Sequence, residues 1–189
     1  MGNRMKNMNS SVSTIPDDTI VRSNIDSELL IKWVQEASEK KPEFKLLWKG
    51  SRDGFGAGTF HAMCDGKGPT LTIVKSTDGY IFGGYLAISW FTGGKRTHDP
   101  KAFIFSLTHK TKHSKQTNEN SMQGCASYGP IFGSGDDIRI SNNCNSNSGS
   151  YSNGNKTYEL PSGVDGGAYF AGTNWFVVRE IEVYSVFGH

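Results

Sequence analysis

The sequence contains few cysteines, and they form no familiar motif. Three occur in 189 residues, at positions 64, 125 and 144, and no two of them make a CxxC pair. A secreted disulfide framework normally uses an even number of cysteines at conserved spacings. The pattern therefore argues against a disulfide-stapled fold and favours a reducing compartment.

Long apolar runs and a strong net charge are also missing. No segment approaches the roughly 20 apolar residues of a membrane-spanning helix, and the first residues lack the apolar core of a secretory signal. Twenty basic side chains against eighteen acidic ones leave a formal charge of +2, too balanced for a nucleic-acid or membrane surface. We expect a cytoplasmic protein with no nucleic-acid partner and no membrane insertion.

Glycine and aromatic residues, by contrast, are plentiful. The 23 glycines and the 12% aromatic content are typical of a β protein with many turns and bulges. A chain of this length buries roughly 70% of the surface that its unfolded form exposes. It can therefore build a core without a disulfide or a metal.

The pattern divides the chain into a leader and one domain. Residues 1–22 are polar and aperiodic, which predicts a disordered or loosely attached leader, and residues 23–189 form a single domain. Leu29, Leu30, Trp33 and Val34 follow at helical spacing. We expect an amphipathic helix that begins near Ile25 and ends before Pro42, docked on a core.

Short strands dominate the rest. A second helix is predicted at 57–64, and Asp78-Gly79 marks a hairpin between strands 70–76 and 80–90. Gly83-Gly84 interrupts the second of these strands, which indicates a bend, a bulge or a close backbone approach. The remaining strand candidates are 44–48, 102–108, 124–128, 131–132, 137–141 and 174–186.

The last strand carries a specific signal. Phe176 and Val178 share one parity, whereas Ile181 and Val183 share the other, so we predict a β-bulge near Arg179-Glu180. The segments 109–115 and 142–155 are predicted to be exposed loops. The fold class is mostly β (α+β): a two-sheet antiparallel sandwich whose short helices cover an edge or an end.

No complete catalytic or metal constellation is visible. His61 and Cys64 lie three residues apart on a predicted helix, but a structural zinc site needs four clustered ligands. Cys64 lies near a helix C-terminus, where the dipole raises a thiol pKa, and Cys125 has no base beside it in the sequence. The glycines at 54–58 lack the spacing of a phosphate loop. We expect no cofactor, no metal and no catalytic group.

Carboxylates are the remaining candidates for chemistry. Asp136 and Asp137 are neighbours, so in a strand they point to opposite faces and do not converge. Glu180 and Glu182 project from one face of the last strand. They form either a pair with a function or an ordinary solvated face.

Taken together, these segments resemble the TLDc domain family between residues 26 and 186. The resemblance is carried by four stretches in order, at residues 46–60 (LLWKGSRDGFGAGTF), 64–90 (CDGKGPTLTIVKSTDGYIFGGYLAISW), 100–107 (PKAFIFSL) and 175–186 (WFVVREIEVYSV). It implies a β-sandwich flanked by helices. The matching positions are Asp53, Gly84, Gly129, Asp137, Gly167, Glu180 and Glu182. The glycines are interpreted as structural residues at bends and turns, and the acids as the candidate functional surface.

The resemblance also implies a function. The family is associated with protection against oxidative stress, and several members bind the vacuolar-type proton pump and alter its assembly. We therefore expect a non-catalytic interaction module whose partner is a protein, with subunits of that pump as the leading candidate. The alternatives are a thiol- or carboxylate-based enzyme of oxidant defence and a glycan-binding sandwich that uses Tyr151 and Tyr169.

Overall fold

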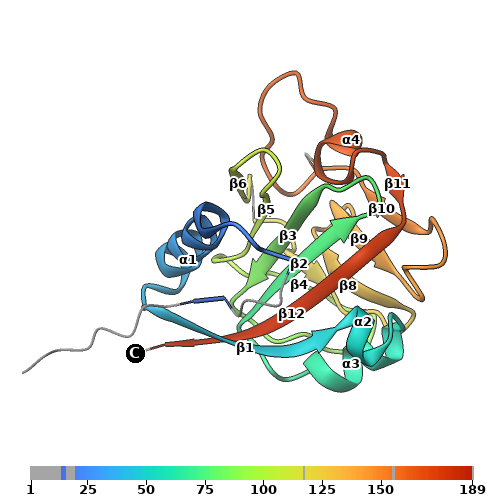
Figure 1. Ribbon diagram of the computed structural model, residues 1–189, viewed down its shortest axis with the longest axis horizontal. Helices are drawn as coiled ribbons and strands as arrows, with labels where there is room; N and C mark the ends of the chain where they lie inside the picture. The colour runs from blue at the N-terminus through green and yellow to red at the C-terminus, as the bar shows by residue number, and fades with distance from the viewer. Residues whose placement is uncertain (1–13, 16–19, 117, 155, 189) are drawn as a thin grey trace, which may run out of the picture.

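The computed structural model describes residues 14–15, 20–116, 118–154 and 156–188 (Figure 1). Within these residues, four short helices accompany the strands: α1 (Asn24–Ser38), α2 (Gly50–Asp53), α3 (Ala57–Cys64) and α4 (Gly166–Ala171). None of these helices combines the length and the apolar character needed to cross a membrane. Most of the predicted leader lies outside the described residues, but Ile15, Ile20 and Val21 are described and are buried.

Two antiparallel six-stranded sheets make up the fold. The first sheet has the order β1 (Pro42–Lys49), β12 (Val178–Gly188), β2 (Thr70–Ser76), β3 (Ile81–Leu86), β5 (Phe103–Ser106) and β6 (Thr111–Ser114). The second sheet has the order β11 (Trp175–Phe176), β10 (Ser150–Ser152), β9 (Ile138–Ser141), β8 (Tyr128–Phe132), β7 (Met122–Gln123) and β4 (Arg96–Thr97). The mostly-β sandwich expected from the sequence is confirmed.

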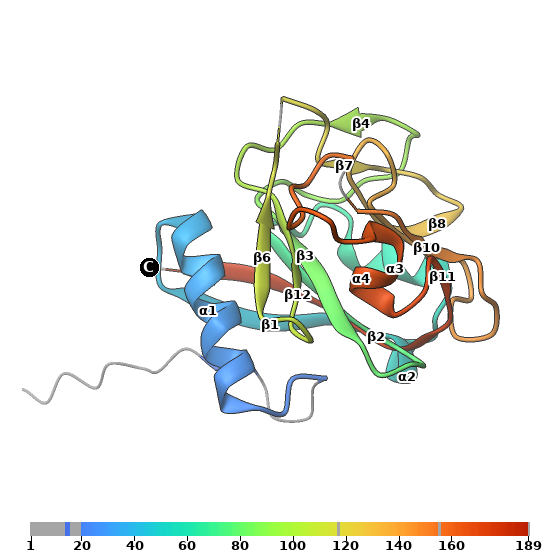
Figure 2. The ribbon, with the colours of Figure 1, turned by 90° about the horizontal axis from the view of Figure 1, so that it is seen from above.

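Apolar side chains cover both faces of the first sheet. One core cluster lies between the sheets and includes Phe82, Phe132 and Ile181. A second cluster lies on the other face, where Trp33 of α1 packs on Phe105 with the ring centroids 6.1 Å apart. Figure 2 shows α1 and the second sheet on opposite sides of the first sheet. The expectation that the helices cover only an edge or an end is therefore wrong for α1, because the outer face of the first sheet is also apolar.

The predicted bulge in the last strand is confirmed. Val178 pairs with Ser76, but the next residue of β2, Lys75, pairs with Glu180, so Arg179 is the extra residue. The bulge allows Val178, Ile181 and Val183 to reach the same core. Without it, one half of the strand would turn its apolar residues away from that core.

Two predicted loops contain strands. In 142–155, the side chains of Ser150 and Ser152 in β10 are buried. Both hydroxyls have partners: the Ser141 amide donates to the Ser150 hydroxyl at 3.1 Å, and the Ser152 hydroxyl donates to the Gly167 carbonyl at 2.7 Å. In 109–115, β6 carries a buried His113. Small polar residues with partners can form interior strands that hydropathy does not reveal.

Other boundaries differ more modestly. Strand 80–90 is shorter than predicted, because β3 ends at Leu86 and the Ala87 amide donates instead to the Asp99 carboxylate at 2.6 Å. The candidate strand 124–128 is absent apart from Tyr128, where β8 begins, and α4 was not expected at all. The helix at 57–64 and the strand at 70–76 have the predicted bounds.

The three candidate structural glycines allow close packing. A Cβ on Gly84 would lie 2.5 Å from the Phe132 ring of the facing sheet, and one on Gly167 would lie 2.1 Å from the Asn174 side chain. At Gly129, Ile140 would be 3.3 Å away. None of the three has a positive φ, so close packing, and not a turn, accounts for them. The pairing across Gly83-Gly84 is continuous, which leaves close approach as the correct alternative there.

We predict that Gly84→Ala destabilises the protein by about 1–3 kcal/mol, because the added methyl group forces Phe132 out of its position. The matched control is Gly58→Ala in α3, where an added Cβ meets nothing within 4 Å and alanine favours a helix by up to about 1 kcal/mol. Urea unfolding measures both. Phe132→Leu combined with Gly84→Ala should recover part of the loss, and equal effects at positions 58 and 84 would contradict the packing argument.

Candidate functional site

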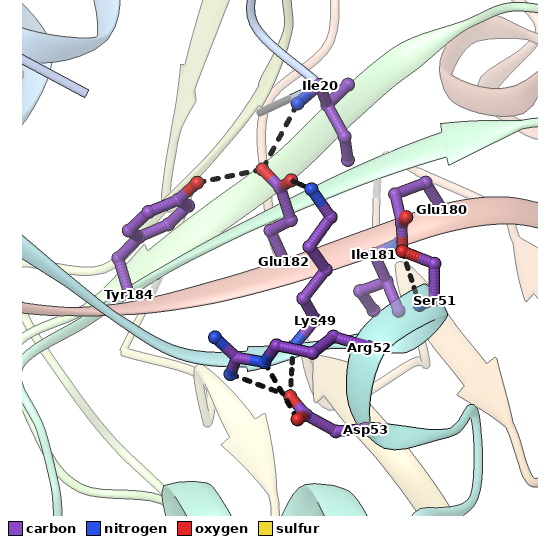
Figure 3. A network of polar contacts seen from close by, with 9 residues as sticks. All are labelled: Ile20, Lys49, Ser51, Arg52, Asp53, Glu180, Ile181, Glu182 and Tyr184. Atoms are coloured by element: carbon purple, nitrogen blue, oxygen red, sulfur yellow. Dashed lines mark hydrogen bonds and ion pairs between the residues drawn. The ribbon is translucent and has the colours of Figure 1, made fainter. Parts of the chain in front are cut away.

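Three of the four candidate acids gather at one place. Asp53 lies at the end of α2, and Glu180 and Glu182 lie on β12, where this strand passes the end of β1 (Figure 3). Asp137 lies just before β9 of the other sheet. The structure therefore brings together Asp53, Glu180 and Glu182, and it places Asp137 elsewhere.

Glu182 is completely buried, with 0% of its surface exposed. Its Oε2 accepts hydrogen bonds from the Tyr184 hydroxyl at 2.8 Å and from the Ile20 amide at 3.2 Å. Its Oε1 lies 3.2 Å from Nζ of Lys49, its cross-strand neighbour on β1. The interpretation of Glu182 as part of an exposed surface is therefore wrong, because the chain at Ile20 covers it.

Burial raises the pKa of Glu182 above its ordinary value of 4.5, and the bonds from Tyr184, Ile20 and Lys49 oppose this rise. A carboxylate removed from water prefers its neutral form unless its partners fully compensate for the lost hydration. Here the compensation is incomplete. The charge on Glu182 is thus a cost to folding that its three partners reduce.

Asp53 and Glu180 hold α2 in place. The Asp53 carboxylate accepts the Lys49 amide at 2.9 Å, and the Arg52 guanidinium donates to it twice at 2.8 Å. The Arg52 bonds lower the pKa of Asp53, and the Lys49 amide adds to this effect while burial opposes it. Glu180 Oε1 accepts the amides of Ser51 at 3.1 Å and Ile181 at 3.0 Å, which ties the start of α2 to β12.

Asp137 organises a loop of the second sheet. Its side chain is fully buried and accepts the Lys156 amide at 3.0 Å and the Thr157 amide at 3.0 and 3.2 Å. It therefore offers no exposed surface, which corrects that part of the sequence interpretation. Asp136 instead turns to Arg139, with 2.8 Å between carboxylate and guanidinium, so the two neighbouring acids do not converge.

The thiols and His61 are also engaged in the fold. Cys64 and Cys144 are buried, and burial raises the pKa of each thiol to about 12, so both stay protonated near neutral pH. His61 Nδ1 lies 2.9 Å from the Asp65 carboxylate, and Nε2 lies 3.0 Å from the carbonyl of the half-buried Cys125. In the part of the chain that the structure describes, no three His, Cys, Asp or Glu side chains are grouped to hold a metal.

The sequence interpretation missed a row of four side chains on the outer face of the second sheet. Arg139, Tyr151 and Trp175 are cross-strand neighbours on β9, β10 and β11, and the adjacent residues Ile138, Ile140 and Phe176 enter the core. The Arg139 guanidinium lies 4.9, 5.7 and 5.8 Å from the ring centroids of Tyr128, Tyr151 and Trp175. We call these four residues the Arg–aromatic row. The alternation of these side chains with apolar residues in the short strands was the signal that could have located the row, but the sequence interpretation singles out only Tyr151.

The pKa of Glu182 leads to a testable pH dependence. Because the folded protein holds this proton more tightly than the unfolded chain, the contribution to stability is complete below pH 4.5 and is lost as pH rises through the raised pKa. Glu182→Gln cannot ionise. The free energy of unfolding of the unmodified protein relative to this variant should therefore fall as the pH rises above 4.5, as measured by urea unfolding.

The control for this experiment is Glu28→Gln, which changes an exposed glutamate of α1. This variant should follow the pH profile of the unmodified protein. A relative stability that rises with pH at position 182 would show instead that the ion pair with Lys49 outweighs the cost of burial.

Comparison with known proteins agrees with the resemblance seen in the sequence. The family model described as the TLDc domain matches residues 16–187. The MTOR-associated protein MEAK7 of Gallus gallus is 31% identical over 97 residues, which cover 51% of this chain and 18% of that protein. The protein of the same name from Danio rerio is 43% identical over 64 residues, covering 34% of this chain and 14% of that protein.

A third relative, MEAK7 of Mus musculus, is 26% identical over 93 residues, covering 49% of this chain and 20% of that protein. The match thus spans a fifth or less of the length of these curated relatives. The family model, however, extends over both sheets and all the described helices. The chain belongs to the TLDc domain family.

Proposed function

We propose that this domain is a non-catalytic module that binds a protein partner through the Arg–aromatic row. The observation that carries the proposal is the composition and exposure of that row. Trp175 exposes 54% of its surface beside Tyr151, with the ring centroids 4.7 Å apart, and the Arg139 guanidinium lies 5.7 and 5.8 Å from the centroids of the Tyr151 and Trp175 rings. Trp, Tyr and Arg are the residues most enriched among those that dominate binding energy at protein interfaces.

The chemistry of the acids and thiols supports a binding role over an enzymatic one. Asp53, Asp137 and Glu180 accept backbone amides, which fixes the path of the chain. Two of the three thiols, those of Cys64 and Cys144, have pKa values of about 12, far from the depressed values of reactive cysteines. The thiol version of the alternative, an enzyme of oxidant defence, therefore rests on Cys125.

The family suggests the partner. Several members of the TLDc family bind the vacuolar-type proton pump, and the family is associated with protection against oxidative stress. The cytosolic sector of that pump is therefore our proposed partner, and the cytoplasm our proposed location. Binding there would influence assembly of the pump. The relatives are named for association with MTOR, which provides a second defined protein to test.

We predict that Trp175→Ala and Tyr151→Ala each weaken binding to the purified cytosolic sector of the pump by roughly 30-fold. This is the effect of losing about 2 kcal/mol at a dominant interface residue. Surface plasmon resonance with the immobilised full chain measures the dissociation constant. A parallel channel with purified MTOR complex separates the two partners.

The matched control is Ile25→Ala, which truncates a large apolar side chain of α1 that is 65% exposed. This variant should bind as the unmodified protein does. Undiminished binding by the Trp175 and Tyr151 variants would overturn the assignment of the row. Absence of binding to the pump sector would overturn the proposed partner.

A further inference from the structure

A polar cavity of about 310 Å³ opens on the outer face of the first sheet, above the buried Glu182. Its cationic lining comes from four separate segments: Arg22 after the buried Ile20 and Val21, Lys49 at the end of β1, Lys75 on β2 and Arg179 on β12. Glu180 and Glu182 complete the charged lining. The cavity is on the first sheet, whereas the Arg–aromatic row is on the second.

The bulge in β12 creates the unusual part of this lining. In a regular strand, Arg179 and Glu180 would point to opposite faces. Because Arg179 is the extra residue, its side chain and that of Glu180 line the same cavity. The bulge therefore adds a guanidinium to a face that already carries Lys75.

The charges in the cavity do not cancel one another. Lys49 is paired with Glu182 at 3.2 Å, which neutralises that part of the lining. Lys75 and Glu180 are cross-strand partners, yet no ion pair joins them within 4.0 Å. Within the described residues, Arg22, Lys75 and Arg179 have no carboxylate within this distance, so three cations face the single carboxylate of Glu180.

That carboxylate is turned toward the backbone. Its Oε1 accepts the Ser51 and Ile181 amides, which spreads its charge away from the cavity. Among the described residues that line the cavity, the remaining excess is two positive charges, from two arginines and a lysine against one glutamate. A phosphate monoester carries about −1.5 to −2 charges near neutral pH and offers three acceptor oxygens. Arginine is the side chain best suited to hold such a group through paired hydrogen bonds.

We propose that this cavity, the anion pocket, binds the phosphate group of a phosphorylated serine or threonine on a protein partner. Arg22 and Arg179 hold the phosphate oxygens from two sides, and Lys75 supplies the third positive charge. Lys49 stays with Glu182 and forms the neutral floor. The inference rests on the proposed function only in assigning the phosphate to a protein; the charge and shape of the pocket stand without it.

The test is an NMR titration of the ¹⁵N-labelled full chain with a phosphoserine peptide, its unphosphorylated form and inorganic phosphate. We expect saturable shifts around β2 and the β12 bulge with the phosphopeptide, tighter binding than with inorganic phosphate, and none with the unphosphorylated peptide. Arg179→Gln and Lys75→Gln should each weaken phosphopeptide binding by about tenfold. Lys45→Gln, an exposed lysine of β1 outside the pocket, should leave it unchanged.

A variant that is expected to strengthen binding shows that the losses in the other variants do not come from unfolding. Glu180→Gln removes the one facing negative charge while keeping an oxygen for the Ser51 amide, so it should strengthen phosphopeptide binding several-fold. No saturable shift, or equal affinity for the two peptides, would overturn the pocket. Inorganic phosphate bound as tightly as the phosphopeptide would overturn its protein origin. A parallel titration with vesicles containing phosphoinositides would overturn it as well if only the vesicles gave saturable binding.

These outcomes are separate from those of the partner experiment. The titration uses no pump sector and no MTOR complex, and the residues that it changes lie on the other sheet from Trp175. The pocket is therefore supported or overturned on its own, whatever the result for the Arg–aromatic row.

Discussion

Burial of both faces of the first sheet is the constraint on which the rest of the structure depends. The inner face packs on the second sheet, and the outer face packs on α1 and on Ile20 and Val21. A strand in such a layer must send apolar side chains to both sides, as β2 does with Val74 inward and Ile73 outward. β12 meets the same demand only because its bulge at Arg179 shifts the side-chain alternation, so that Val178 and Ile181 both face inward.

This constraint also explains why a carboxylate is buried. Glu182 occupies an outward position of β12 between β1 and β2, where Tyr184, Lys49 and the chain at Ile20 cover it at the bottom of the anion pocket. Replacing a buried ion pair by apolar residues often leaves the stability unchanged or increases it, so the pair of Glu182 and Lys49 need not stabilise the fold. The pair instead fixes the positions of three segments, because it joins β1, β12 and the chain at Ile20 at one point. The neighbouring acids Asp53 and Glu180 join α2 to the same point.

The sequence was informative wherever periodicity or turn chemistry was strong. The spacing of Leu30, Trp33 and Val34 identified α1, and the change of parity between Val178 and Ile181 located the bulge. It was uninformative where burial depends on distant hydrogen bonds. Nothing near Ser150 or Ser152 reveals that both are interior, because their partners are Ser141 and Gly167. Likewise, local sequence does not show that Asp137 receives the amides of residues 156 and 157, or that Ile20 covers Glu182.

The ends of the two sheets have a further consequence for behaviour at high concentration. The outermost strands of the second sheet, β11 and β4, are two residues long, and β6 of the first sheet has four. The longest border strand, β1, begins with Pro42 and carries the exposed Lys45. Short borders, proline and lysine are the features that discourage strand addition between molecules. The edge strands of the two sheets, whose unpaired N–H and C=O groups could pair with another molecule, are thereby protected from forming sheets between molecules.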